Sequence, residues 1–315
     1  MTLLFEHPDC LEHDMGAGHP ERPDRLRAVQ AALANDEFAG LDRCPAPLAT
    51  AAQIALVHPQ SYIDNIIATA PTKGQVQLDP DTAMNPGTLG AAQRAVGAVC
   101  AAVDAVMAGP DYNAFCAVRP PGHHAEPGRS MGFCIFNSVA IGAQHARAAH
   151  GPTHGLTDGL RRVAVVDFDV HHGNGTQAAF WDDEDLFYGS THQMPLYPGT
   201  GAISETGQGN IHNYPLPPGA GSMAFRDAFN DGLIPALEAF EPDFLLISAG
   251  FDAHADDPLA QLRLETEDYT WATEKLLAVA AQHCQGRVVS SLEGGYDLAA
   301  LAAATAAHVR VLMTF

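Results

Sequence analysis

The feature that most limits the fold is an alternation of short apolar runs with longer alanine-rich segments along the chain. The short runs are β-branched or almost continuously apolar, as expected for strands buried on both faces of a sheet. The candidate strands are Thr2–Phe5, Ala114–Val118, Val163–Asp167, Leu186–Ser190, Phe244–Ser248 and Arg287–Leu292. The candidate helices between them are Pro23–Leu33, Thr88–Met107, Ser138–His150, Ala224–Phe240, Glu267–His283 and Leu298–Leu312. This order predicts βαβ units and therefore an α/β fold with a mainly parallel sheet.

Composition and charge limit the organisation and the partners. The 315 residues are 47% hydrophobic and 17% charged, which is enough apolar content for a sizeable core. No low-complexity linker or internal repeat interrupts the pattern, so we expect one domain over residues 1–315. The formal net charge of −21 opposes binding to phosphate backbones and predicts no nucleic-acid partner. It favours cationic partners such as basic peptides or amines, although an acidic surface also serves solubility alone.

The cysteines and the N-terminus bear on the compartment. The six cysteines form no Cys-x-x-Cys pair, which argues against a disulfide framework and a cysteine-bound zinc. The first residues show no basic leader, and no uninterrupted apolar stretch is long enough for a membrane span. We therefore expect a cytoplasmic protein with no membrane partner. A homo-oligomer is possible, with loops 16–22 and 73–85 available for contacts.

Polar motifs directly follow four of the candidate strands. In parallel sheets, ligands bind at the carboxyl ends of the strands, which lie at one edge. The sequence therefore predicts one pocket to which four strand ends contribute. The four motifs occupy residues 119–124, 167–176, 250–252 and 293–296.

Three of these polar residues could hold a metal ion. Asp169 and His171 are two positions apart at a strand end, where alternate residues point to the same face. A carboxylate and an imidazole are ordinary ligands of Zn²⁺, and Asp252 could supply a third. Three protein ligands leave a position for water, as in catalytic zinc sites, although Fe²⁺ or Co²⁺ also suit these donors. Each residue alone could be a polar loop residue or a helix cap; their combination predicts the metal site.

Two further features suggest acid–base chemistry. His123 and His124 are adjacent, and different hydrogen-bond acceptors could separate their pKa values and leave one imidazole neutral. That imidazole could act as a general base at neutral pH. Tyr296 follows two glycines, where the backbone can approach a ligand, and its phenol could stabilise an oxyanion. A surface histidine pair and a core tyrosine are the simpler alternatives.

Together these motifs resemble the histone deacetylase superfamily, which also includes the acetylpolyamine amidohydrolases. The resemblance extends from residue 19 to residue 296, and its most specific part is the Asp-His run. It implies an arginase-like, three-layer α/β/α fold with a central, mostly parallel sheet of about eight strands and one catalytic Zn²⁺. The matching motifs are Arg-Pro-Pro-Gly-His-His (119–124), Met-Gly-Phe-Cys-Ile-Phe-Asn (131–137), Asp-Phe-Asp-Val-His-His-Gly-Asn-Gly-Thr-Gln (167–177), Gly-Phe-Asp (250–252) and Glu-Gly-Gly-Tyr (293–296).

The resemblance also implies roles for single residues. His124 would be the general base, beside Asn174, and His123 would be held by Asp167. Asparagine at position 174 is similar to the class II enzymes, whereas class I enzymes carry aspartate there. An amide cannot compensate an imidazolium charge as a carboxylate does, so the pKa of His124 should differ from the class I case. Tyr296 would stabilise the oxyanion, and the zinc ligands would be Asp169, His171 and Asp252.

Further residues are implied around the zinc. A structural K⁺ would be bound by oxygen atoms of Asp167, Asp169, His171, Ser190 and Thr191. Arg25 matches the arginine near the cavity through which acetate leaves. The substrate tunnel would be lined by Phe133, Tyr197, Leu259, Gly132 and Gly295.

The predicted reaction is hydrolysis of an N-acyl-lysine, in a peptide or protein, or of a similar small amide to acetate and free amine. The stretch 58–87 is too short for the insertion of acetylpolyamine specialists, and Leu259 stands where a related branch places glutamate. Both features make an acetylpolyamine amidohydrolase the second choice. An arginase-type ureohydrolase with two Mn²⁺ ions is disfavoured, because Gly173 stands where that enzyme needs a bridging aspartate. A catalytically silent acyl-amine-binding protein is the non-enzymatic alternative, although the expected catalytic residues are all present.

Overall fold

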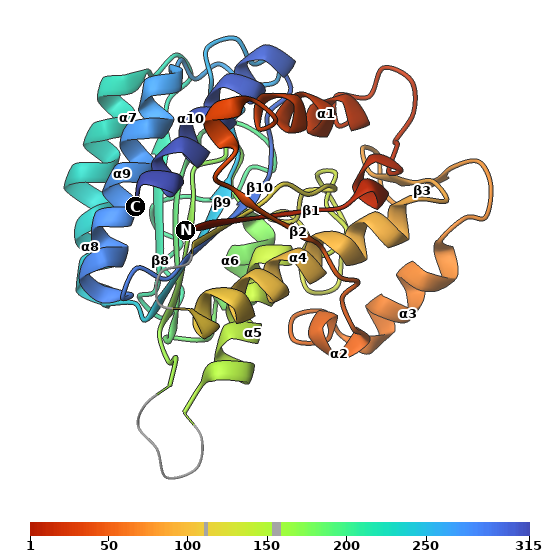
Figure 1. The fold of residues 1–315 in the computed structure, drawn as a ribbon, viewed down its shortest axis with the longest axis horizontal. Helices are drawn as coiled ribbons and strands as arrows, with labels where there is room; N and C mark the ends of the chain where they lie inside the picture. The colour runs from red at the N-terminus through yellow and green to blue at the C-terminus, as the bar shows by residue number, and fades with distance from the viewer. Residues whose placement is uncertain (110–112, 153–158) are drawn as a thin grey trace.

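A computed structural model describes residues 1–109, 113–152 and 159–315 (Figure 1). Its centre is an eight-stranded sheet in the order β2-β1-β5-β10-β9-β6-β7-β8, with every neighbouring pair parallel. The α/β fold and the sheet of about eight mostly parallel strands are therefore confirmed. The strands are β1 (Thr2–Glu6), β2 (Asp42–Pro45), β5 (Asn113–Cys116), β6 (Val163–Asp167), β7 (Leu186–Gln193), β8 (Ile211–Leu216), β9 (Phe244–Ala249) and β10 (Val288–Leu292); β3 (Val76–Gln77) and β4 (Ala83–Met84) form a small antiparallel pair.

The two edge strands of the sheet were not predicted. The central strands β5, β6, β9 and β10 are buried at every residue, as their apolar runs indicated. Strand β2 is almost wholly exposed, and β8 mixes buried with half-buried positions. Edge strands commonly carry polar side chains, so neither has the continuous apolar run that marks a central strand.

Helices cover both faces of the sheet and complete the three layers (Figure 1). Helices α4, α5 and α6 pack against one face, and α1, α7, α8, α9 and α10 lie on the other. The bounds are α1 (Pro23–Ala32), α2 (Ala51–Ile54), α3 (Gln60–Thr69), α4 (Thr88–Ala108), α5 (Ser138–His150), α6 (Asn174–Phe180), α7 (Ser222–Ala228), α8 (Ile234–Phe240), α9 (Thr266–His283) and α10 (Leu298–Thr314).

One predicted helix is interrupted. The segment 224–240, expected to be continuous, contains a π-helical turn over Phe229–Leu233 that separates α7 from α8. A Cβ atom at Gly232 would lie 2.2 Å from a ring carbon of Tyr214, so the wide turn lies directly against strand β8. The chain is helical throughout residues 222–240, but helical periodicity did not predict the π-helical turn within this segment.

Helix α4 has the length and hydropathy of a membrane span, but 61% of its apolar window is buried in the protein. A Cβ atom at Gly97 would lie 2.0 Å from the carbonyl oxygen of Pro47. The helix therefore packs closely against a neighbouring loop, as a core helix does.

Candidate active site and metal centre

The four motifs predicted to share a pocket do meet at one edge of the sheet. They follow β5, β10, β9 and β6, which are consecutive neighbours in the sheet, so their carboxyl ends lie side by side. The cavity at this edge has a volume of about 240 Å³. It is lined by Asp81, His124, Gly132, Phe133, His171, Leu196, Tyr197, Leu259 and Tyr296.

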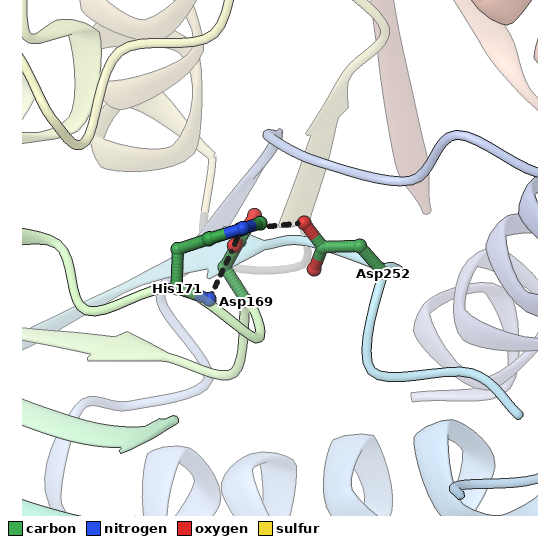
Figure 2. Close-up of side chains that lie close together, drawn as sticks. All are labelled: Asp169, His171 and Asp252. Carbon is green, nitrogen blue, oxygen red and sulfur yellow. Dashed lines mark hydrogen bonds and ion pairs between the residues drawn. The ribbon is translucent and has the colours of Figure 1, made fainter. Parts of the chain in front are cut away.

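Three potential metal ligands converge beside this pocket (Figure 2). Ligand atoms of Asp169, His171 and Asp252 all lie within 4.8 Å of one another. The Nδ1 atom of His171 lies 3.1 Å from Oδ1 of Asp169 and 3.1 Å from Oδ2 of Asp252. Burial would lower the pKa of His171, but hydrogen bonds to the two carboxylates outweigh it and raise the pKa to about 10. Two carboxylates and an imidazole nitrogen directed at one point are a donor set that fits a divalent cation.

Glycines let the backbone approach these carboxylates closely. A Cβ atom at Gly250 would lie 2.0 Å from Oδ2 of Asp169, and one at Gly294 would lie 2.2 Å from Oδ2 of Asp252. The backbone N–H of Gly294 donates to Oδ2 of Asp169 at 2.8 Å, and that of Val170 donates to Oδ1 of Asp252 at 2.8 Å. Each carboxylate thus has one oxygen held by the backbone while the other faces His171. Such partners orient the ligands of a metal before it binds.

The two adjacent histidines have different acceptors. Nδ1 of His123 lies 3.0 Å from Oδ2 of Asp167, and Nδ1 of His124 lies 2.8 Å from Oδ1 of Asn174. Burial would lower the pKa of His123, but the surrounding carboxylates raise it to about 10. Burial and then the positive charges of the neighbouring imidazoles hold the pKa of His124 well below its usual value. The pair therefore combines a cationic imidazole with a neutral one.

The phenol of Tyr296 lines the pocket, and contacts behind it hold it in place. The carboxylate of Asp257 accepts hydrogen bonds from the backbone N–H of Tyr296 at 2.7 Å and of Leu259 at 3.0 Å. The guanidinium of Arg25 lies 4.7 Å from the centroid of the tyrosine ring, and its Nε donates to the carbonyl of Gly295 at 2.5 Å. Burial raises the pKa of Tyr296 well above its usual value, so the phenol stays protonated and can donate. Gly295 is buried and is not among the residues that line the pocket, although the resemblance implied that it would line the tunnel.

The other implied wall residues do line the pocket. The rings of Tyr197 and His124 are in edge-on contact, with their centroids 5.2 Å apart. The rings of Phe133 and Tyr296 are arranged in the same way, with their centroids 5.9 Å apart. A Cβ atom at Gly132 would lie 2.4 Å from Cδ2 of His124, so only glycine allows the chain to pass beside this imidazole.

Several residues at the site were missed by sequence reasoning. Oε2 of the buried Glu293 accepts hydrogen bonds from the backbone N–H of Gly122 at 2.6 Å and of His123 at 3.2 Å. It therefore fixes the turn that carries both histidines, and burial raises its pKa to about 7. Its place in the Glu-Gly-Gly-Tyr motif was an available signal. Asp81, which adds a half-buried carboxyl group to the pocket, and Asp257 carried no such signal.

The residues implied to bind potassium lie beside the metal ligands. Strand β7 pairs with β6 so that Ser190 lies opposite Asp167. The hydroxyl of Thr191 is buried and has no hydrogen-bond partner among the described residues. A buried hydroxyl without a partner is costly, so this atom is compatible with a cation ligand.

Comparison with known proteins identifies the family. The family model described as histone deacetylase domain matches residues 19–312. Histone deacetylase 10, chloroplastic, from Oryza sativa subsp. japonica is 40% identical over 332 residues, covering 99% of this chain and 73% of that protein. The histone deacetylase-like amidohydrolase of Pseudomonas aeruginosa is 38% identical, covering 89% of this chain and 73% of that protein.

Two further matches cover almost the whole chain. A probable deacetylase of Methanothermobacter thermautotrophicus is 40% identical, covering 98% of this chain and 90% of that protein. The crystal structure of the HDA15 HD domain matches with a TM-score of 0.92 at 35% identity, covering 99% of this chain and 88% of that chain. Together with the geometry of the pocket, these matches show that the chain belongs to the histone deacetylase family and is a hydrolase of amide bonds.

Proposed function

We propose that this protein is a zinc-dependent deacetylase, with residues 1–315 forming one catalytic domain, that hydrolyses N-acyl-lysine or a similar small N-acyl amine. The products are acetate and the free amine. The observation that carries the proposal is that His124, Tyr296 and His171 line one pocket, and that His171 joins Asp169 and Asp252 in a metal-ligand triad beside it.

Asp169, His171 and Asp252 would hold the zinc ion. Their two carboxylates and one imidazole match the ligand types of catalytic zinc sites. When bound, such an ion polarises the amide carbonyl and lowers the pKa of a water molecule. Oxygen atoms of Asp167, Ser190 and Thr191, with others from the neighbouring metal ligands, would hold a structural K⁺.

The protein's own groups divide the proton transfers between them. Nδ1 of His124 is occupied by the carbonyl oxygen of Asn174, so Nε2 is the nitrogen that accepts a proton from the attacking water. The same nitrogen then returns the proton to the leaving amine. His123, held by Asp167, is the electrostatic and hydrogen-bonding partner beside the base, and the phenol of Tyr296 donates a hydrogen bond to the developing oxyanion.

The pocket wall favours an acyl-lysine over an acetylpolyamine. Phe133, Leu196, Tyr197 and Leu259 offer aromatic and aliphatic surface to the methylene chain of a lysine. Leu259 has no carboxylate for the distant ammonium group of a polyamine, and Asp81 is the one described residue of the pocket lining that carries a carboxyl group. The presence of the proposed base, the phenol and the metal-ligand triad in and beside one pocket also disfavours a silent binding protein.

The test is a substrate comparison with the zinc-loaded protein. We expect faster release of acetate from an acetyl-lysine peptide than from N-acetylputrescine, together with loss of activity on chelation and recovery with added Zn²⁺. A strong preference for N-acetylputrescine would reverse the substrate assignment. Bound zinc without hydrolysis of any acyl amine would indicate the silent binding protein.

A further inference from the structure

We infer that Glu126 is a positioning residue for the proposed base: it sets the orientation of the Asn174 amide, and through it the tautomer of His124. This inference rests on the proposed function, in which His124 exchanges a proton at Nε2.

Three side chains form a row of hydrogen bonds that leads away from the pocket. Nδ1 of His124 lies 2.8 Å from Oδ1 of Asn174, and Nδ2 of Asn174 donates to Oε1 of Glu126 at 2.8 Å. The sulfur of Met131 lies 3.3 Å from the same amide nitrogen. His124 and Asn174 are buried, while Glu126 is half-buried. The amide therefore lies between an imidazole and a carboxylate.

The carboxylate decides which end of the amide faces the imidazole. An ionised glutamate only accepts hydrogen bonds, so Glu126 requires the NH₂ end of Asn174 and leaves the carbonyl end for His124. That carbonyl requires a proton on Nδ1 and leaves Nε2 free to accept one. If the Asn174 amide were reversed, its carbonyl oxygen would face the Glu126 carboxylate, and both groups are acceptors. Its NH₂ group would then face Nδ1 of His124. The proton of the neutral imidazole would then sit on Nε2, the atom that has to take one up.

The backbone around Glu126 is well fixed. The N–H groups of Glu126 and Arg129 donate to each other's carbonyl oxygens at 2.9 and 3.2 Å, which closes a tight turn. The N–H of Gly175 donates to the carbonyl oxygen of His123 at 3.0 Å. A Cβ atom on Gly175 would lie 2.2 Å from the carbonyl oxygen of Ala125. The start of helix α6 and the histidine segment are thus in direct contact. This contact fixes the position of the Glu126 carboxylate relative to the Asn174 amide.

The role is orientation rather than charge. No hydrogen bond joins Glu126 directly to His124; the two are connected through Asn174. Glutamine and alanine at position 126 separate the two roles, because glutamine keeps an oxygen acceptor without charge and alanine has neither.

The first test compares kcat of Glu126→Ala and Glu126→Gln on an acetyl-lysine peptide. Since general-base catalysis contributes about 10²–10⁴-fold, we expect Glu126→Ala to lower kcat by about tenfold or more, with little change in KM. Glu126→Gln should recover most of the loss. Equal losses in both variants, or no loss in Glu126→Ala, would overturn the inference.

The second test repeats the alanine substitution in an Asn174→Asp background. A carboxylate has two equivalent acceptor oxygens, so its orientation no longer matters. We therefore expect Glu126→Ala to lower kcat when residue 174 is the natural asparagine, but not in the Asn174→Asp background. The same loss in both backgrounds would contradict an orientation role.

A third measurement does not depend on turnover. Imidazole ¹⁵N chemical shifts report the tautomer of His124, whose signals are identified by their absence in His124→Ala. We expect the Nδ1-protonated form in the natural protein and in Glu126→Gln, and a mixture of tautomers in folded Glu126→Ala. An unchanged tautomer in Glu126→Ala would overturn the inference. If the natural protein binds zinc but hydrolyses no acyl amine, the proposed function fails, and these shifts still decide the role of Glu126.

Discussion

The floor of the pocket and its wall are built from different side chains and held by different contacts. We use floor for the buried polar residues of and around the metal site, of which His171 reaches the pocket; they are Asp167, Asp169, His171, Asp252 and Glu293, with exposed fractions from 0% to 9%. The wall comprises Phe133, Leu196, Tyr197 and Leu259, and the tyrosine is 39% exposed. Each floor carboxylate has a backbone N–H or imidazole partner, whereas the wall meets the floor through ring contacts.

The wall also depends on a carboxylate, but a distant one. Glu205 accepts hydrogen bonds from the backbone N–H groups of Gly201 at 3.0 Å and Ala202 at 3.1 Å, and from Nε2 of Gln177 at 2.6 Å. These bonds fasten the loop that carries Tyr197. Changes in the floor should therefore alter metal binding and kcat, and changes in the wall should alter substrate preference.

The largest effect should follow loss of a metal ligand. Asp252→Ala removes one of the three donors, and we expect the protein to lose bound zinc. We also expect kcat to fall by at least about 100-fold, because even partners of metal ligands are worth about 10–100-fold. Metal content per chain and acetyl-lysine turnover measure the two effects. The exposed neighbour variant Asp256→Ala is the control and should keep its zinc. Retention of zinc and activity in Asp252→Ala would show that the floor is not the metal site.

The next largest effect should follow loss of the Tyr296 hydroxyl, since this residue lines the pocket and contacts Phe133 of the wall. Tyr296→Phe should lower kcat by about 10²–10³-fold, the usual loss for one oxyanion donor, while zinc content stays the same. Tyr214→Phe, on strand β8 away from the pocket, is the matched control. Turnover near the natural level in Tyr296→Phe would remove the phenol from the mechanism.

A smaller effect should appear as a shift in pH dependence. Burial and the neighbouring imidazoles hold the pKa of His124 low, and a carboxylate in Asn174→Asp would favour the imidazolium and raise that pKa. A base works only when neutral, so activity is lost as the pH falls through its pKa. The acidic limb of kcat/KM should therefore move to higher pH in Asn174→Asp but not in the exposed control Asn35→Asp. An unmoved limb would mean that His124 is not the titrating base.

The smallest effect should come from the wall. Leu259→Glu places a carboxylate near the pocket, where an exposed ion pair contributes up to about 1 kcal/mol, or roughly fivefold. We expect kcat/KM for N-acetylputrescine to rise by about this factor relative to an acetyl-lysine peptide. Leu259→Gln, which is similar in size but uncharged, should not change the ratio. A large fall in kcat on both substrates would show that wall and floor are not separable at this position.

Much of the floor could be predicted because its residues lie in local patterns. Asp169 and His171 lie in the bend that directly follows the apolar strand β6, and Asp252 follows a second apolar strand. The paired histidines and the Gly-Gly-Tyr turn are likewise short motifs after strands. The mainly parallel sheet followed from the same apolar runs, because only strands buried on both faces need them.

The remaining features depend on contacts between segments far apart in the chain. The partners of Tyr296 and Asn174, which are Asp257 and Glu126, are ordinary acidic residues until folding places them beside these two side chains. The edge strands, and the close approach of Gly232 to Tyr214 at the π-helical turn, likewise involve neighbours that no local pattern reveals.

The sequence by itself determined the type of sheet, the chemical groups of the site and the family, because these follow from local periodicity and short motifs. Only the tertiary structure decided how deeply the two histidines are buried and which charges surround each of them, and so which imidazole is cationic and which is neutral. The physical reason is that the charge of a buried imidazole is set by burial and by groups within a few ångströms, and those groups come from other strands.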